Sequence, residues 1–324
     1  MNVISRLLEG HRNWPGLIFT LLGLLFVLAG SRCTPDDPSL DTSLPVDTVN
    51  LKTPRIVPAG GNFHVKTDVQ LVTDTLPAGA VIEYSLDKGQ TWQVGQQFTL
   101  IKGGQVMARL RADNRVSLTR SASFRLYFER MLIIGNSITS HPPVASIGWF
   151  NSNGMAASAP EKDYVHLLTA NLETLYKPLL VRLQNGGDFE LKFGAPDYTR
   201  AEFAPVINDF KPDLIVVRLG ENMDENRVQP YDLETQYRTL LAELSSTSQP
   251  HKIICTTSVW ARPKADAVIR KVTTEKGYVL VDLSGMVGQS RYFAGQYSNP
   301  AVAAHPNDVG MQQIADLIWE KFNN

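Results

Sequence analysis

Three polar residues follow or precede apolar stretches of the sequence at places where their side chains could act on an acyl group. Ser137 follows an apolar run that begins at Met131, Asn222 follows a run that begins at Leu214, and His305 precedes the last amphipathic stretch. A serine hydroxyl can attack a carbonyl carbon when a histidine removes its proton. An asparagine amide can donate to the oxyanion that this attack creates. Together, the three residue types point to ester or acyl chemistry.

Taken singly, these residues also have ordinary structural explanations. A serine or an asparagine beside a glycine is common in turns. Asp308 is a natural cap for the last helix. His305 has no such role, because it lies outside that helix and beside Pro306, which fixes the chain direction. The order of serine, asparagine and histidine, each at the end of an element, is more specific than any one of them.

The second half of the chain alternates apolar runs with amphipathic stretches, which is typical of parallel strands covered by helices on both faces. We expect strands at 132–134, 179–183, 214–219, 253–258 and 279–282. We expect helices at 164–176, 200–210, 231–244, 264–276 and 309–322. In such folds ligands bind beyond the carboxyl ends of the strands, so the segments that follow the strands are where a site is expected.

The same segments match the sequence blocks of a known enzyme family. Gly135-Asn136-Ser137 is similar to the nucleophile block of the SGNH (GDSL-like) hydrolases, and Gly220-Glu221-Asn222 is similar to their third block. Gly187 followed by Asp188 resembles the second block, and His305 fits the last one. The resemblance implies an α/β fold over residues 129–324, a three-layer α/β/α flavodoxin-like sandwich with a parallel sheet.

The resemblance also implies roles for these residues. Ser137 would be the nucleophile and His305 the base, and the oxyanion would be held by Asn222 together with the N–H groups of Gly187 and Ser137. Gly186 is a close alternative to Gly187. The family needs no cofactor.

Two positions depart from the pattern of the family. Asn136 replaces the usual aspartate of the nucleophile block, and Val302 stands where an aspartate is expected three residues before the histidine. We favour a Ser-His dyad in which a backbone carbonyl orients the imidazole, since loss of the acid lowers the rate without abolishing the chemistry. His141 is an alternative base. The alternative acids are Asp188, Glu190, Glu221 and Asp308.

Residues 51–128 consist of short alternating runs between turn signals, which predicts an all-β sandwich. Its segments 82–92 and 108–126 resemble the small β-sandwich appended to chitobiase-like and other carbohydrate-active enzymes. A spacer is favoured over a sugar-binding module, because no binding site is visible. Residues 32–50 are rich in Pro, Asp, Ser and Thr and predict a linker.

Residues 1–31 have the composition of a signal peptide, with basic residues before a 14-residue apolar run at 17–30. The run is shorter than the roughly 20 residues that a membrane-spanning helix needs, so export is favoured over an uncleaved anchor. Cys33 could be lipid-anchored, although Arg32 occupies the position of the expected small residue. The alternative is cleavage after Ala29-Gly30-Ser31. We expect a periplasmic or cell-surface location, with any membrane attachment through the N-terminus.

Composition excludes several function classes. The formal net charge is −1 and no basic run is present, which argues against a nucleic-acid partner. No HExxH, Cys-x-x-Cys or EF-hand-like motif occurs, so neither a metal nor a cofactor is expected. Cys33 and Cys255 are the only cysteines, and Cys255 lies in an apolar run, so no disulfide framework is expected.

The sequence therefore predicts an exported serine esterase or deacylase. Its substrate would be a small-molecule or glycan ester, with O-acetylated carbohydrate as the first class to test. The alternative is a non-catalytic surface glycan-binding protein built on a degenerate hydrolase fold. No signal for an oligomeric state is present.

Overall fold

The computed structural model describes residues 44–323. The predicted signal peptide, Cys33 and most of the predicted linker lie outside the described residues. Within residues 44–323, no helix is both long and apolar enough to cross a membrane.

Nine short strands occupy the described chain before Phe128. They are β1 (Arg55–Val57), β2 (Gly61–His64), β3 (Thr67–Val72), β4 (Val81–Ser85), β5 (Gln93–Val94), β6 (Gln97–Leu100), β7 (Gly104–Ala112), β8 (Arg115–Val116) and β9 (Arg120–Tyr127). One sheet has the order β1-β3-β6 and the other β2-β9-β7-β4-β5, with β8 paired to β7. Leu71 of the first sheet and Leu110 and Phe124 of the second belong to one apolar cluster. The two sheets therefore share a core, while the domain limits at 51 and 128 remain predictions.

The described chain after Phe128 forms a parallel sheet and its helices. The strands are β10 (Arg130–Gly135), β11 (Leu180–Asn185), β12 (Leu214–Val217), β13 (Lys252–Thr256) and β14 (Val279–Val281), in the order β11-β10-β12-β13-β14. The helices are α1 (Tyr164–Glu173), α2 (Gly187–Lys192), α3 (Phe203–Phe210), α4 (Leu233–Leu244), α5 (Pro263–Glu275), α6 (Pro300–Ala303) and α7 (Asp308–Asn323). Four short 3-10 turns are η1 (Ala145–Ile147), η2 (Pro160–Lys162), η3 (Ser284–Met286) and η4 (Ser290–Tyr292).

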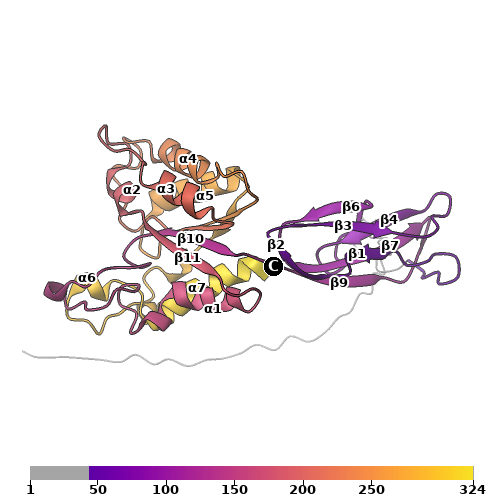
Figure 1. Cartoon of the computed structure of the whole chain (residues 1–324), viewed down its shortest axis with the longest axis horizontal. Helices are drawn as coiled ribbons and strands as arrows, with labels where there is room; N and C mark the ends of the chain where they lie inside the picture. Colours follow the sequence, from indigo (N-terminus) through magenta and orange to yellow (C-terminus); the bar gives the residue numbers. More distant parts are fainter. Residues whose placement is uncertain (1–43, 324) are drawn as a thin grey trace, which may run out of the picture. The chain divides into compact units, whose positions relative to one another are not determined.

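Side chains along the central strands alternate between two helical layers. Ile133 and Val216 belong to the apolar cluster that includes α1 and α7, whereas Ile134 and Val217 belong to the cluster that includes α3, α4 and α5. Figure 1 shows these helices on opposite sides of the sheet. Every residue of β12 is buried, which explains why this strand is a continuous apolar run. The predicted three-layer α/β/α class with a parallel sheet is confirmed.

The edge strand β11 differs from the expectation that every strand is covered on both faces. Among the described strands it pairs only with β10, and Leu180 and Leu183 are 47% and 41% exposed. The apolar residues of β11 correctly predict a strand, but they wrongly predict that it is buried. The short helices α2 and α6 were not expected, because neither is long enough to show a helical period.

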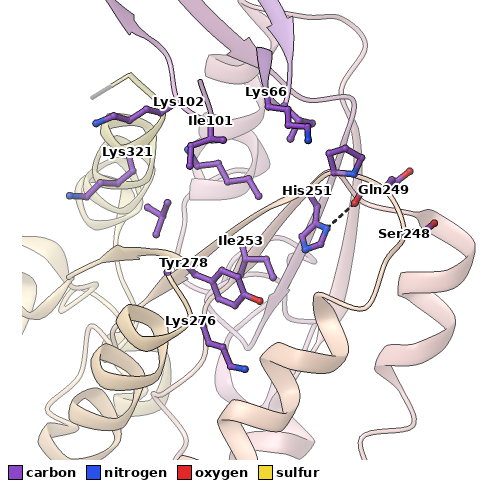
Figure 2. Close-up of a pocket in the computed structure, with 15 residues that line it drawn as sticks. Lys66, Ile101, Lys102, Ser248, Gln249, His251, Ile253, Lys276, Tyr278 and Lys321 are labelled. Carbon is purple, nitrogen blue, oxygen red and sulfur yellow. Dashed lines mark hydrogen bonds between the residues drawn. The ribbon is translucent and has the colours of Figure 1, made fainter. Parts of the chain in front are cut away.

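Figure 2 shows a pocket at the amino-terminal ends of β13 and β14, near Lys252 and Val279. Its wall is rich in lysine: Lys66, Lys102, Lys252, Lys276 and Lys321. None of the predicted site residues lines this pocket. Since ligands of parallel α/β sheets bind beyond the carboxyl ends, the candidate site lies at the opposite end of the sheet.

Candidate active site

A tight turn after β10 carries Ser137. A Cβ atom on Gly135 would lie 1.9 Å from Oγ1 and 2.8 Å from Cβ of Thr139, so only glycine allows the chain to turn here. The carbonyl oxygen of Asn136 accepts from the N–H of Thr139 at 2.9 Å, and its Oδ1 accepts from the N–H of Ile138 at 3.1 Å. The position of Ser137 is therefore fixed by its immediate neighbours.

The hydroxyl of Ser137 and the imidazole of His305 are in contact, 168 residues apart in sequence. Oγ of Ser137 lies 2.7 Å from Nε2 of His305, and Nδ1 of the same ring lies 2.7 Å from the carbonyl oxygen of Ala301. A carbonyl oxygen can only accept, so Nδ1 carries the hydrogen. Nε2 is then the acceptor for the serine hydroxyl, as a general base requires.

The carbonyl that orients His305 comes from the one-turn helix α6. Asn299 caps this helix by accepting from the N–H of Ala301 at 2.9 Å. Val302 is fully buried in a small apolar cluster with Trp149, Met155, Ala156 and Ala294. The position where the family has its aspartate is therefore packed among apolar side chains, and the Ala301 carbonyl is the group that bonds to Nδ1.

Two of the four alternative acids bond elsewhere at the surface. Oδ2 of Asp188 lies 3.0 Å from Nζ of Lys192. Asp308 accepts from the N–H of Ser158 at 2.8 Å and from its hydroxyl at 2.6 Å. Among the described residues, neither carboxylate has a bond to His305, so the geometry does not support either as the third member of a triad.

The alternative base His141 has no bond to Ser137 in the described part of the chain. Its Nδ1 donates to the carbonyl oxygen of Pro142 at 2.7 Å. Its own carbonyl oxygen accepts from Nε1 of the buried Trp149 at 3.1 Å. Of the two histidines, the structure places His305 at the serine hydroxyl.

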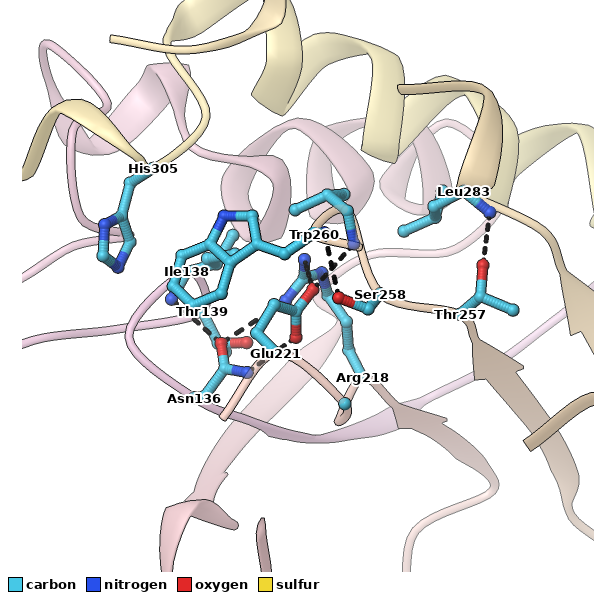
Figure 3. A network of polar contacts seen from close by, with 12 residues as sticks. Asn136, Ile138, Thr139, Arg218, Glu221, Thr257, Ser258, Trp260, Leu283 and His305 are labelled. Atoms are coloured by element: carbon cyan, nitrogen blue, oxygen red, sulfur yellow. Dashed lines mark hydrogen bonds and ion pairs between the residues drawn. The ribbon is translucent and has the colours of Figure 1, made fainter. Parts of the chain in front are cut away.

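Burial lowers the pKa of His305 to about 4, although the hydrogen bond to Ala301 and the charge of Glu221 act in the opposite direction. Part of this burial comes from Trp260 (Figure 3). The rings of Trp260 and His305 are almost perpendicular, and their centroids are 5.4 Å apart. Nε1 of Trp260 donates to the carbonyl oxygen of Ala304 at 2.8 Å. The imidazole is therefore neutral, and able to accept a proton, at neutral pH. Sequence reasoning missed Trp260, whose only signal is an aromatic residue soon after a strand end.

A buried polar network lies beneath the nucleophile turn (Figure 3). Nδ2 of Asn136 donates to Oε1 of Glu190 at 3.1 Å and to Oε2 of Glu221 at 2.8 Å. Arg218 donates to Oε1 of Glu221 at 2.7 Å, with both side chains excluded from solvent. An aspartate at position 136 could not donate to two carboxylates. The departure of Asn136 from the family pattern thus has a physical reason, and Glu190 and Glu221 bond to this network rather than to His305.

Two glycines follow β11, and their N–H groups differ. The N–H of Gly186 donates to the carbonyl oxygen of Gly135 at 2.8 Å, as part of the backbone pairing. The N–H of Gly187 donates at 2.7 Å to Oδ1 of Asn185, an exposed side chain that can rotate away. Among the described residues, the N–H of Ser137 has no acceptor. Gly187 is therefore better placed than Gly186 to donate to an anion.

The amide of Asn222 lies at the end of the segment that follows β12. Its Nδ2 donates to Oε2 of Glu190 at 2.7 Å, and its backbone N–H lies 3.4 Å from Oε1 of the same carboxylate. The second hydrogen of the amide is left for another acceptor. No group of His, Cys, Asp and Glu within residues 44–323 is arranged to hold a metal ion.

No protein-family model matches the sequence, and no curated protein matches it. Solved structures are similar at low identity. An acetylxylan esterase from Geobacillus stearothermophilus is 18% identical over 60% of this chain and 94% of its own, with a TM-score of 0.37. A protein from Bacteroides uniformis described as a GDSL-like lipase is 16% identical over 59% of this chain and 94% of its own, with a TM-score of 0.41.

A salicylyl-acyltransferase from a tetracycline biosynthetic pathway is 16% identical over 76% of this chain and 75% of its own, with a TM-score of 0.41. At these identities and scores the likenesses do not decide the activity of this chain.

Proposed function

We propose that the protein is a serine ester hydrolase with a Ser-His catalytic dyad. The observation that carries the proposal is the 2.7 Å contact between Oγ of Ser137 and Nε2 of His305. It is supported by the bond from Nδ1 to the Ala301 carbonyl, which leaves Nε2 as the proton acceptor. Burial of the ring keeps it neutral at the pH where a base is needed.

In the first half of the reaction, Nε2 of His305 takes the hydroxyl proton as Oγ of Ser137 attacks the acyl carbon. The electron pair of the carbonyl π bond moves onto the carbonyl oxygen, which becomes the oxyanion of a tetrahedral intermediate. When this intermediate collapses, the ester C–O bond breaks and the imidazolium gives its proton to the departing alcohol. Water then attacks the acyl-serine by the same route, with His305 again as the base, and releases a carboxylic acid.

Three donors are assigned to the oxyanion: the N–H groups of Ser137 and Gly187 and the amide of Asn222. The Ser137 N–H is free of other acceptors among the described residues, and the Gly187 N–H bonds only to the exposed Asn185 side chain. Stabilisation of the oxyanion by donors that are already in place before the reaction is usually the largest single contribution to the rate enhancement. Rotation of Asn185 away from Gly187 would accompany substrate binding.

O-acetylated carbohydrates are the substrate class proposed for this site, since residues 51–128 resemble accessory modules of carbohydrate-active enzymes. Export, through the signal-peptide-like residues 1–31, belongs to the same proposal. The alternative of a non-catalytic glycan-binding protein rests on Asn136 and Val302. Both residues have structural reasons that are compatible with catalysis, because one donates to two glutamates and the other packs in an apolar cluster.

Fluorophosphonate labelling tests the proposal directly. The wild-type protein should be labelled on Ser137, and Ser137→Ala should lose both the label and the hydrolysis of nitrophenyl acetate and acetylated oligosaccharides. Ser140→Ala is the matched control, since the Ser140 hydroxyl bonds only to the carbonyl oxygen of Ser152 among the described residues. This variant should leave labelling unchanged. Absence of labelling in the folded wild-type protein, or full turnover by Ser137→Ala, would overturn the assignment.

A further inference from the structure

The carboxylate of Glu190 is completely buried, and its hydrogen-bond partners among the described residues are all N–H groups. Oε1 accepts from the N–H of Gly220 at 2.6 Å and from Nδ2 of Asn136 at 3.1 Å. Oε2 accepts from Nδ2 of Asn222 at 2.7 Å. Glu190 lies on α2, after β11, so it ties the segment after β12 to the nucleophile turn after β10.

Holding this carboxylate in place is energetically costly. Burial and the neighbouring charge of Glu221 raise the pKa of Glu190, and the N–H donors of Gly220, Asn222 and Asn136 oppose that rise. Among the described residues, the buried guanidinium of Arg218 bonds to Glu221 and not to Glu190. Residues that only fill space are rarely charged, so a buried carboxylate surrounded by donors calls for a specific role.

We propose that Glu190 is a positioning residue for the oxyanion hole, because it holds one amide hydrogen of Asn222 and thereby presents the other to the oxyanion. This inference rests on the proposed function. An asparagine amide can rotate to exchange its oxygen and its nitrogen, and the two orientations are similar in shape. A carboxylate can only accept, so Glu190 selects the orientation in which Nδ2 faces it. The oxygen of Asn222 is thereby kept away from the developing negative charge.

Glu190→Gln separates this role from a structural one, because it preserves size and removes a buried charge. The glutamine oxygen should stay with the N–H of Gly220, which places the glutamine NH2 against Asn222. The amide of Asn222 then turns its oxygen toward glutamine and also toward the oxyanion. Loss of a correctly aimed oxyanion donor lowers kcat by about 10²-fold or more with little change in KM.

The decisive comparison uses the full-length variants Glu190→Gln, Asn222→Ala and the double variant, with nitrophenyl acetate as the probe. We expect Glu190→Gln and Asn222→Ala each to lower kcat, and the double variant to be no slower than Asn222→Ala alone, since both remove the same donor. Asp266→Asn is the control: Asp266 is another buried carboxylate, bonded to the N–H of Ser258, and its variant should keep kcat.

Two outcomes would overturn the inference: a Glu190→Gln protein with wild-type kcat, or losses in the two single variants that add fully in the double variant. These results leave the proposed function standing if Ser137→Ala is inactive, whereas failure of Ser137→Ala to lose activity overturns the function itself. Should Glu190→Gln not fold, Glu190→Asp keeps the charge but shortens its reach. Its loss of kcat should likewise disappear in the Asn222→Ala background.

Discussion

The guanidinium of Arg218 donates to the carboxylate of Glu221 at 2.7 Å, and neither side chain reaches solvent. Arg218 also lies 3.4 Å from Oδ1 of Asn136. Two buried glutamates, Glu190 and Glu221, share the network with this one guanidinium. Within residues 44–323, Arg218 is the cation that bonds to the side chains of this network, so the charge balance beneath Ser137 depends on it.

Arg218→Met should leave the negative charge of Glu221 buried without its cationic partner. Removing one partner of a buried ion pair costs about 3 to 5 kcal/mol, and urea unfolding would measure the loss. The double variant Arg218→Met with Glu221→Gln should recover part of it, because the unpaired carboxylate is removed as well. A free energy of unfolding for Arg218→Met equal to that of wild type would contradict this account of the network.

The pH dependence of kcat/KM should reflect the burial of His305. The ring must be neutral to accept the serine proton, and burial lowers its pKa to about 4. Activity should therefore persist from neutral pH down to about pH 5 and fall by half near pH 4. Stability should decline over the window from the ordinary value of 6.5 down to about 4, because the unfolded chain binds the proton first. Circular dichroism at each pH separates unfolding from titration.

An acid limb near pH 6.5 or above would count against this prediction. It would mean that a carboxylate, rather than the Ala301 carbonyl, stabilises the protonated ring. The experiment thus also tests the dyad, since an undetected third acid would move the limb upward.

Much of the α/β fold could be predicted because its strands are buried on both faces. Each residue of β12 is buried, and a continuous apolar run is what such a strand requires. The edge strand β11 was found by the same signal, but its exposure follows from the strand order, which the sequence alone does not contain. Helices α2 and α6 could not be predicted, because their six and four residues, respectively, are too few to show a helical period.

The site was predictable only in part. Ser137, Asn222 and His305 lie beside the ends of strands or helices, and in a parallel α/β fold such positions can be predicted to come together. The contacts that set their orientation and pKa are made by residues far away in the sequence. Glu190 is one of the alternative acids for His305 in the sequence, whereas its bond to Asn222 joins residues that are 32 positions apart and depends on the tertiary fold. Backbone acceptors such as the Ala301 carbonyl leave no trace in residue identity.

Trp260→Ala should uncover the imidazole of His305. The ring centroids of Trp260 and His305 are 5.4 Å apart, so removal of the indole exposes the imidazole to water. This exposure weakens the desolvation that lowers the pKa of His305. The acid limb of kcat/KM should move upward, toward the ordinary histidine value. Trp319→Ala is the control, because Trp319 packs against Phe322 on α7. A limb that moves equally in both variants, or in neither, would show that Trp260 does not control the titration.

Val302→Asp restores the residue that the family pattern expects, yet it should be harmful. The new carboxylate would be buried among Trp149, Met155 and Ala294, while Nδ1 of the histidine already bonds to Ala301. Burial of an unpaired polar or charged group predicts a loss of about 3 kcal/mol or more in unfolding free energy. Val302→Thr, which is similar in size and uncharged, should lose less. An upward shift of the acid limb in a stable Val302→Asp protein would instead show that the carboxylate reaches the imidazole.

Asn136→Asp also restores a family residue and gives the sharpest test of the buried network. Asn136 donates to Glu190 and Glu221, so an aspartate would replace two hydrogen bonds with repulsion among three carboxylates. This repulsion raises the pKa of one of the three carboxyl groups, so that it holds a proton. The folded protein then becomes less stable as the pH rises, because that proton is lost. We expect a loss of about 2 to 4 kcal/mol at neutral pH, from the unmade bonds and the unpaired charge.

The pH dependence distinguishes this cause from simple misfolding. Stability and turnover of Asn136→Asp should recover partly between neutral pH and about pH 5, where His305 is still neutral and one carboxylate can be protonated. Adding Glu221→Gln to Asn136→Asp should restore stability at neutral pH, because it removes one of the three charges. A variant that is equally unstable at both pH values, and that Glu221→Gln does not rescue, would show that Asn136 acts through its shape and not through its two donated hydrogens.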